Sequence, residues 1–386
     1  MEFQSRTQAI QISGIRKFSE LVSQYPNALS LTIGQPHLPT PEHIRIAAQR
    51  AIGEGDTGYT PNRGTLALRE AAATYYRRLI GIDYDPATEM LVTVGATHAL
   101  DIAMRTLLQP GDEVIIPAPA YPGYEGIVKL LGAEVVYVDT RQDGLLLTED
   151  ALRQAITPRT RMVILASPVN PTGVVYPRER LQALAEVLAD TKVWVISDEI
   201  YCELQFAGSP TSISLLPGMR DRTIVIHGLS KSHSMTGWRI GFAFAPANVS
   251  AEMAKVVQYG VSCASSVSQR AALAALREGA DDARPMRELY QHNRDVVVAL
   301  FAAMDIPLVR PDGAFYAFPA LADALGDTSE HIAHRLLAEA GVAVVPGDAF
   351  SPFGEGYVRL SYACDPDVLR EALRRIEAFV AHAGRA

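Results

Sequence analysis

Short apolar runs alternate with amphipathic segments between about residues 90 and 245. The apolar runs are MLVTVGA, EVIIPAP, EVVYVD, RMVILAS, VWVISDEI, TIVIHGLS and GFAFAP. Between them lie segments such as THALDIAMRTLLQ and RERLQALAEVLAD, whose apolar residues recur every three or four positions, as in helices. Nearly continuous apolar strands separated by helices indicate an α/β fold with a mostly parallel sheet that is sandwiched by helices.

The last hundred residues follow a different pattern. A helical stretch from about 265 to 305 precedes short strands and helices such as GAFYAFP, VAVVPG, YVRLSY and PDVLREALRRIEAFV. This order predicts a smaller α+β domain, with which the N-terminal segment is expected to pack. We therefore predict a large domain over 46–281 and a small domain made of 1–45 and 282–386. No flexible linker separates them, so firm contact between the two is expected.

Composition and charge narrow the range of partners. The chain has 386 residues and a formal net charge of −8, with no block of like charge. Nucleic acid and anionic membranes favour a basic face, so neither is expected as a partner. The N-terminus has no apolar signal segment, and the run VVVALFAAM is too short to span a bilayer. Three widely spaced cysteines, Cys202, Cys263 and Cys364, fit a reduced, cytoplasmic protein.

Ligands of open α/β sheets bind beyond the C-terminal ends of the strands, so the polar residues there are the candidates for chemistry. Lys231, one of only five lysines, comes just after the strand TIVIHGLS. A lysine held partly out of water can lose its proton and attack a carbonyl. Ser230 and Arg239 flank it and suit a phosphate group. The competing interpretation is an ordinary solvated lysine.

Two further strand ends carry polar groups that suit a flat heterocycle. Asp198 ends the strand VWVIS, where a buried carboxylate could keep a ring nitrogen protonated; a structural aspartate is the alternative. Tyr201 could donate to a ring oxygen, or be a core tyrosine. Asn170 lies between Pro168 and Pro171, which could hold its amide toward a ligand or simply form a turn.

Three other segments complete the set. The backbone amides at the start of the helix after TVGA form a candidate phosphate cradle, at Gly95, Ala96 and Thr97. Tyr121, in PAPAYPGY, could stack on an aromatic ring or pack in the core. Arg359, inside the strand YVRLSY, needs an anionic partner: either an internal carboxylate or the α-carboxylate of a substrate. One ligand requires all of these groups, namely pyridoxal 5′-phosphate (PLP) joined to an amino acid.

The order of GATHA, PAPAYPGY, SPVNPTG, SDEIY, SKSHSMTGWRIGF and YVRLSY resembles the class I/II PLP-dependent aminotransferases of fold type I. The resemblance covers almost the whole chain, from LTIGQPHLPTP to PDGAFYAFP and beyond. The segments ISGIRKF, VSCASSVSQ and GEGYVRLSYAC are most similar to the bacterial aminotransferase A subgroup. Members of that subgroup are often named as N-acetyl-LL-diaminopimelate aminotransferases.

The resemblance implies a role for each residue that contacts the cofactor. Lys231 is similar to the lysine that binds PLP covalently, and Asp198 to the partner of the ring nitrogen. Asn170 and Tyr201 resemble the ligands of the ring hydroxyl. The phosphate site has counterparts in Gly95, Ala96, Thr97, Ser230 and Arg239.

The same resemblance implies which residues stack on the cofactor, bind the substrate and contact a neighbouring subunit. Tyr121 is similar to the tyrosine that stacks on the cofactor. Tyr59 resembles the residue that reaches the phosphate of a neighbouring subunit, which implies a homodimer with active sites at the interface. Arg359 and the backbone of Gly34, together with Asn170, resemble the α-carboxylate site.

Two positions depart from the pattern or lack a role. Gly228 stands where many family members carry a serine two residues before the SK pair, so one phosphate hydroxyl is expected to be missing. His98, beside the phosphate turn, has no assigned role. The pair His331 and His334 could share one helix face, but a solvated face is the favoured interpretation and no metal site is predicted.

These assignments predict ping-pong transamination from an L-amino acid, of acidic or diaminopimelate type, to a 2-oxo acid such as 2-oxoglutarate. Lys231, Asp198 and Tyr201 are the predicted catalytic residues. A fold type I β-lyase would use the same ligands and stays an alternative. A non-catalytic cofactor sensor is disfavoured because there is no room for a DNA-binding domain, and a nicotinamide dehydrogenase because no GxGxxG follows a strand.

The identity of the substrate is open at this point. A second acidic group on the substrate would require a cation beside the site. The candidates, chosen because their segments are expected to flank it, are Arg16, Lys17 and Arg63.

Overall fold

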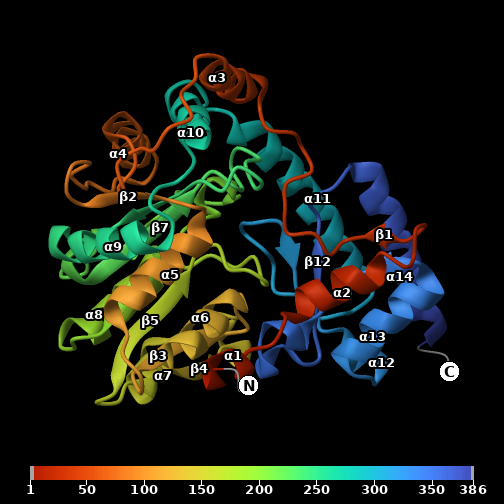
Figure 1. Cartoon of the computed structure of the whole chain (residues 1–386). Coiled ribbons are helices and arrows are strands. Elements are labelled where there is room, and N and C mark those ends of the chain that lie inside the picture. The colour runs from red at the N-terminus through yellow and green to blue at the C-terminus, as the bar shows by residue number, and fades with distance from the viewer. Residues whose placement is uncertain (1–3, 384–386) are drawn as a thin grey trace.

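The computed structural model describes residues 4–383, and a seven-stranded sheet lies at its centre (Figure 1). The strand order is β2–β8–β7–β6–β5–β3–β4. Only β8 runs antiparallel to its neighbours, so the prediction of a mostly parallel sheet is confirmed. Each of the seven apolar runs forms one strand: β2 (Met90–Thr93), β3 (Glu113–Ala118), β4 (Glu134–Asp139), β5 (Thr160–Ala166), β6 (Trp194–Asp198), β7 (Thr223–Gly228) and β8 (Gly241–Phe244).

Helices cover both faces of this sheet. Successive side chains of a buried strand point to opposite faces, so Ile196 and Val195 of β6 belong to different apolar cores. One face packs against α5 (Ala96–Leu107), α6 (Gly123–Leu131) and α9 (Ala247–Gly260). The other face packs against α7 (Glu149–Ala155), α8 (Arg178–Ala189), α4 (Leu66–Ile80) and α10 (Ser266–Glu278), and α10 in turn contacts α3 (Glu42–Gly53).

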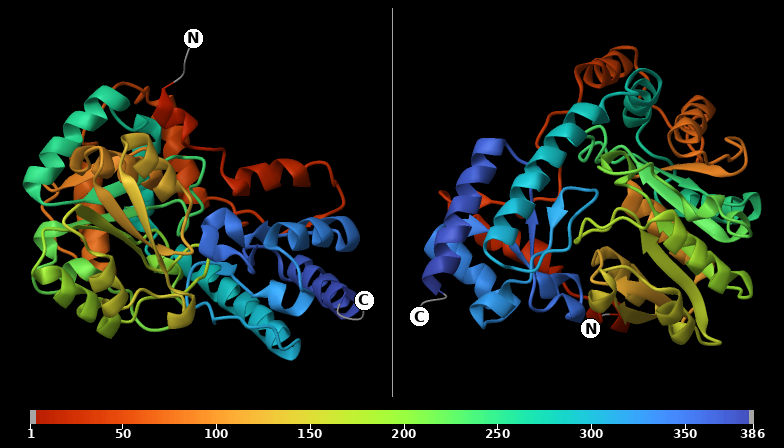
Figure 2. Two further views of the ribbon diagram at one scale, coloured as in Figure 1. Left: turned by 90° about the horizontal axis from the view of Figure 1, so that it is seen from below. Right: turned by 180° about the vertical axis from the view of Figure 1, so that it is seen from behind.

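A separate apolar core lies beside the sheet, in a smaller lobe (Figure 2). Strands β11 (Val345–Pro346), β12 (Val358–Ser361) and β9 (Tyr316–Ala317) form one antiparallel sheet, and β1 (Leu29–Ser30) pairs with β10 (Val342–Ala343). The lobe's helices are α11 (Ala283–Ala303), α12 (Leu321–Leu325), α13 (Ser329–Arg335) and α14 (Pro366–Ala383).

The N-terminal segment contacts both lobes. Helix α2 (Gly14–Val22) buries Phe18 in the core of the small lobe, where Leu31 also lies. The short helix α1 (Ser5–Gln8) instead contacts α6 of the large lobe. The domain limits 46–281 and 1–45 with 282–386 remain a prediction.

The helical stretch predicted over about 265–305 is two helices, α10 and α11, rather than one. The break falls at Gly279, where a β-carbon would collide with the carbonyl oxygen of Ala275 and the side chain of Asp282. From this break α11 runs into the small lobe (Figures 1 and 2).

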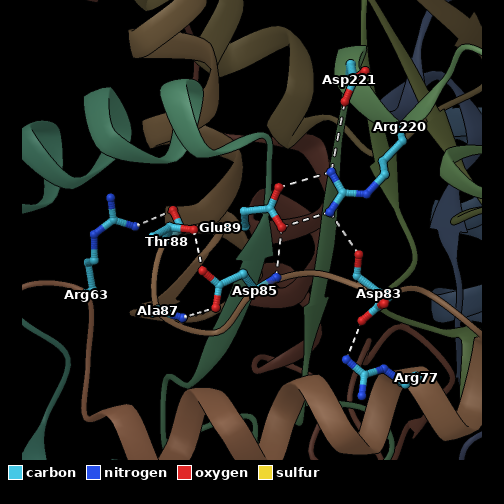
Figure 3. Close-up of polar contacts among 9 residues, drawn as sticks. All are labelled: Arg63, Arg77, Asp83, Asp85, Ala87, Thr88, Glu89, Arg220 and Asp221. Atoms are coloured by element: carbon cyan, nitrogen blue, oxygen red, sulfur yellow. Dashed lines mark hydrogen bonds and ion pairs between the residues drawn. The ribbon is translucent and has the colours of Figure 1, made fainter.

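The loop before β2 is held by a polar network (Figure 3). The guanidinium of Arg220 contacts Glu89 at 2.8 Å and donates to the carbonyl of Asp83 at 2.9 Å. The backbone N–H of Asp85 donates to the same Glu89 carboxylate at 2.8 Å. Because β2 leads directly into α5, this network fixes the start of the segment that carries the predicted phosphate cradle.

Candidate active site

A cavity of about 740 Å³ lies between the C-terminal ends of the sheet strands and the small lobe. Strands β3, β5, β6 and β7 are mutually parallel, so the residues that follow them meet at one edge of the sheet. The cavity is lined by every site residue named from the sequence except Gly95 and Tyr59: Gly34, Ala96, Thr97, Tyr121, Asn170, Asp198, Tyr201, Ser230, Lys231, Arg239 and Arg359.

Lys231 lies three residues after the end of β7, and its amine points across to the N-terminal segment. Its Nζ donates a hydrogen bond to the carbonyl oxygen of Gly34 at 2.7 Å. Burial, together with the guanidinium groups of Arg359 and Arg239, lowers the pKa of the Lys231 amine to about 8, against the opposing effect of Asp198. A much larger share of this amine is therefore unprotonated at neutral pH than for a solvated lysine, as a nucleophile requires.

Asp198 ends β6 and is buried beneath the cavity. Its carboxylate accepts hydrogen bonds from the hydroxyl of Tyr124 at 2.6 Å and from the backbone N–H of Ile200 at 3.3 Å. Burial raises the pKa of Asp198, and these two hydrogen bonds only partly oppose the effect. A protonated ring nitrogen beside this carboxylate would stabilise its charged form, so the site fits a cationic heterocycle.

Tyr124 was missed by the sequence reasoning. It lies in the motif PAPAYPGY, three residues after Tyr121, at the start of α6. Its ring packs edge-on against that of Tyr121, with centroids 5.4 Å apart. A second tyrosine at helical spacing was the available signal, but only the tertiary structure shows that its hydroxyl reaches Asp198.

The N-terminus of α5 forms the predicted anion cradle. Gly95 is its N-cap residue and adopts φ of 79°, a left-handed conformation that favours glycine. A β-carbon here would also collide with the guanidinium of Arg239. The first backbone N–H groups of a helix, at Ala96 and Thr97, have no partner within the helix and bind anions. This cradle with Arg239 and the buried Ser230 fits a phosphate group.

Arg359, on β12 of the small lobe, is only 1% exposed. Its Nη1 donates to Asn170 Oδ1 at 3.0 Å and its Nη2 to the carbonyl of Thr32 at 2.7 Å. Neither partner is acidic, and within residues 4–383 its Nε has no hydrogen-bond partner. A buried cation without a counter-ion is costly, so this guanidinium fits an anionic ligand such as a carboxylate.

The hydroxyl of Tyr201 lies 2.9 Å from that of Tyr316, a residue of β9 that also lines the cavity. The ring of Tyr316 lies beneath Arg359, with the guanidinium carbon 4.4 Å from the ring centroid. Tyr316 was also missed from the sequence, although PDGAFYAFP was among the motifs that carried the resemblance. Its alternating apolar pattern indicates a core strand and gives no sign of a polar role.

The structure shows the surroundings of three positions that the sequence analysis singled out: Gly228, His98 and Tyr59. Gly228 is closely packed: a β-carbon would lie 3.1 Å from the carbonyl oxygen of Ile240, so a serine does not fit without a shift. His98 accepts a hydrogen bond through Nδ1 from the N–H of Val94 at 3.1 Å. Burial lowers the pKa of His98, consistent with a neutral ring that closes the turn. Tyr59 lies outside the cavity and is 93% exposed.

Of the three candidate cations for a second acidic group, only Arg16 lines the cavity. It lies on α2, whose apolar face packs on the small lobe and whose other face borders the cavity. Arg63 donates instead to the carbonyl of Thr88 at 3.0 Å, in the network of Figure 3. Lys17 contacts Gln11 at 3.3 Å.

His331 and His334 have different partners. The Nδ1 of His331 lies 2.5 Å from Asp327 Oδ2, and the ring of His334 packs edge-on against Phe18. Among residues 4–383, no three His, Cys, Asp or Glu side chains are grouped as a metal site would need. Over the same residues, no helix is both long and apolar enough to cross a membrane.

The fold and the cavity are typical of a class of α/β enzymes in which three groups bind one ligand. These groups are a lysine at a strand end, an anion cradle at a helix N-terminus and a buried arginine. Residues 26–376 match the family model "Aminotransferase class I and II". The chain belongs to this family, which is PLP-dependent, and it is an amino acid aminotransferase.

Its relatives and structural neighbours carry related names. A Bacillus subtilis protein named "Probable N-acetyl-LL-diaminopimelate aminotransferase" is 52% identical, over 97% of this chain and 95% of that protein. An aspartate aminotransferase from Geobacillus stearothermophilus is 40% identical, over 97% of each. The structure of a Thermus thermophilus aspartate aminotransferase with maleate superposes with a TM-score of 0.92 at 38% identity, covering 98% of this chain and 99% of that one.

The lowered pKa of Lys231 predicts its reactivity without cofactor. With a pKa near 8, roughly a tenth of the amine is neutral at pH 7, against roughly one part in three thousand at a pKa of 10.5. Reductive labelling of the cofactor-free protein with a small aldehyde, followed by peptide mass spectrometry, should modify Lys231 with a midpoint near pH 8. Lys255, exposed and paired with Glu252, is the comparison site. Identical pH profiles at both lysines would contradict the prediction.

Proposed function

We propose that this aminotransferase binds PLP in the cavity and transfers the amino group of an L-amino acid with a second acidic group to a 2-oxo acid such as 2-oxoglutarate. It works as a homodimer in the cytoplasm, where the free state of its three cysteines is expected; cell fractionation tests this location. The observation that carries the proposal is one cavity lined by both an amine of lowered pKa, Lys231, and a buried arginine, Arg359, that has no acidic partner among residues 4–383.

In this proposal, each residue predicted to contact the cofactor has a specific role. Lys231 binds it covalently, and Asp198, oriented by Tyr124, keeps its ring nitrogen protonated. Asn170 and Tyr201 hydrogen-bond the ring hydroxyl. The stacking ring and the phosphate site are supplied by Tyr121, Gly95, Ala96, Thr97, Ser230 and Arg239.

The chain's own groups bind the substrate and move its proton. Arg359 holds the α-carboxylate through its guanidinium, with Asn170 and the backbone of Gly34 beside it. When bound, PLP supplies an electron sink for the electrons left on the substrate's α-carbon. The Nζ of Lys231, freed when the substrate's amine replaces it and with a pKa near the working pH, would take the proton from that carbon and pass it to the cofactor carbon that carried the aldehyde. In the second half of the cycle the same amine would move a proton from that cofactor carbon to the α-carbon derived from the 2-oxo acid.

The nature of the substrate is inferred from Arg16 and from the names of the relatives. Aspartate and N-acetyl-LL-diaminopimelate, after which relatives are named, both carry a second carboxylate. Lys231, Arg239 and Arg359 already have roles, so Arg16 is the remaining arginine or lysine among the described cavity-lining residues. We assign it to the distal carboxylate of the substrate.

The homodimer is inferred from exposed aromatic residues. Tyr59 and Tyr259 are 93% and 87% exposed, although large aromatic side chains are usually buried in a core or an interface. In the dimer, Tyr59 of one subunit contacts the phosphate bound by the other.

Replacing Lys231 tests the function directly. Lys231→Ala should abolish the covalent absorption band of the holoenzyme and lower transamination at least about a thousandfold, because the nucleophile and the base are lost together. Absorption spectra with added PLP and a coupled keto-acid assay measure both effects. A Lys231→Ala protein that retained normal turnover would refute the assignment, and Lys255→Ala serves as the control.

Replacing Arg16 tests the substrate class. Arg16→Gln should raise KM for acidic donors and for 2-oxoglutarate by roughly ten- to a hundredfold, the usual contribution of a charge-assisted hydrogen bond. The half-reaction with a neutral donor such as alanine should be unchanged. Lys17→Gln, one residue along and outside the cavity lining, is the matched control. Equal losses for acidic and neutral donors would exclude Arg16 as the specificity residue.

Mixing two impaired variants tests the position of Tyr59. Tyr59→Ala should weaken PLP binding at least about tenfold in the dimer, because a phosphate contact is lost. At a PLP concentration that leaves the Tyr59→Ala homodimer largely unloaded, mixing these subunits with Lys231→Ala subunits should restore up to about a quarter of the wild-type activity, since one site of each mixed dimer has both residues intact. Absence of any regain, with light scattering showing that subunits exchange, would place Tyr59 in its own subunit's site; a monomer mass would refute the dimer.

A further inference from the structure

Tyr316 lies between the part of the cavity proposed to hold the cofactor, near Tyr201, and the part proposed to hold the substrate carboxylate, near Arg359. It is 1% exposed, and its hydroxyl lies 2.9 Å from that of Tyr201, on the side proposed to face the cofactor. Its ring lies 4.4 Å from the guanidinium carbon of Arg359, on the side proposed to face the substrate carboxylate. A β-carbon on Gly34 would lie 2.8 Å from the Tyr316 hydroxyl, so that residue has to be glycine for Tyr316 to occupy this place.

We propose that Tyr316 is a positioning residue whose hydroxyl donates to the hydroxyl of Tyr201 and whose ring supports the guanidinium of Arg359. One side chain of the small lobe thereby sets both the donor to the cofactor's ring oxygen and the carboxylate-binding group. This inference rests on the proposed function, since it requires a cofactor beside Tyr201.

The direction of the hydrogen bond follows from counting hydrogens. Each phenol has one O–H to donate, and the geometry allows either hydroxyl to be the donor to the other. Tyr201 can donate to a ring oxygen only if its hydrogen is not given to Tyr316. The hydrogen between the two phenols therefore comes from Tyr316, and a hydroxyl that accepts one hydrogen bond becomes a stronger donor in the next.

The ring of Tyr316 acts on Arg359 in a different way. The guanidinium carbon lies over two aromatic rings, 4.4 Å from the centroid of Tyr316 and 4.9 Å from that of Phe350. Aromatic faces stabilise a cation without neutralising it, so the charge of Arg359 stays available for a carboxylate. An acidic side chain in the same place would compete with the substrate.

The charged and titratable groups around the pair come from several elements. Arg359 of β12 stabilises the charged form of both phenols, whereas Asp198 of β6 opposes ionisation of Tyr201, and Tyr121, after β3, opposes that of Tyr316. The amine of Lys231 lies 5.7 Å from the centroid of the Tyr201 ring. Burial dominates and raises the pKa of both tyrosines, so both remain protonated donors over the working pH range.

The test is a pH titration of the visible absorption band of the holoenzyme. A hydrogen bond to an anionic oxygen lowers the pKa of that oxygen, and Tyr316 strengthens the bond donated by Tyr201. Tyr316→Phe should therefore raise the titration midpoint by roughly 0.3–1 unit, less than Tyr201→Phe does. The double variant should shift the midpoint no further than Tyr201→Phe alone, because Tyr316 acts through Tyr201.

Substrate kinetics separate the hydroxyl from the ring. Tyr316→Phe keeps the ring, so KM for the amino donor should stay within about twofold of wild type. Tyr316→Leu should raise KM roughly three- to thirtyfold, the range of a cation–π contact, and shift the midpoint as Tyr316→Phe does. Tyr362→Phe removes another buried hydroxyl of the small lobe, one that has no hydrogen-bond partner within residues 4–383, and it should change neither quantity.

Two outcomes would overturn the inference. The first is an unchanged midpoint in Tyr316→Phe while Tyr201→Phe shifts it, and the second is additive shifts in the double variant. Failure of the proposed function looks different, because wild-type protein would then show no cofactor band. Circular dichroism and cofactor content confirm that each variant is folded and loaded before comparison.

Discussion

The burial of Lys231 where the sheet meets the small lobe is the constraint on which the site depends. Its amine contacts the carbonyl of Gly34, and this contact joins the end of β7 to the N-terminal segment. Burial, together with the guanidinium groups of Arg359 and Arg239, lowers the pKa of the Lys231 amine to about 8. The place of this lysine in the fold therefore also sets its reactivity.

Two other polar contacts cross between the lobes at the same cavity. Arg359 reaches Asn170, and Tyr316 reaches Tyr201. In each pair the large-lobe residue lies at a strand end and the small-lobe residue on a short strand. The geometry of the site therefore depends on how the two lobes pack, and a change in that packing would alter cofactor and substrate contacts together.

The sequence predicted the fold from local rules, and the strand-end residues together with the family resemblance predicted eleven of the site residues that line the cavity. Buried parallel strands are apolar, and their polar ends must meet at one edge of the sheet. The break at Gly279, the partners of Arg63 and the roles of Tyr124 and Tyr316 were not predicted. These depend on contacts between segments far apart in the chain, as when Tyr124 of α6 reaches Asp198 of β6. Periodicity identifies a tyrosine as buried but does not identify its hydrogen-bond partner.

The segment around Thr32 and Gly34 contributes to the site through main-chain oxygens, which accept from Arg359 and Lys231. A carbonyl group is the same in every amino acid, so this contribution leaves little trace in residue identity. Side-chain substitutions at Thr32 would therefore have little effect on the contact that its carbonyl makes with Arg359. Changes to the backbone itself, such as an amide-to-ester replacement or a one-residue deletion, would disturb that contact. Part of this enzyme's function therefore depends on the path of the main chain and not on which side chains the segment carries.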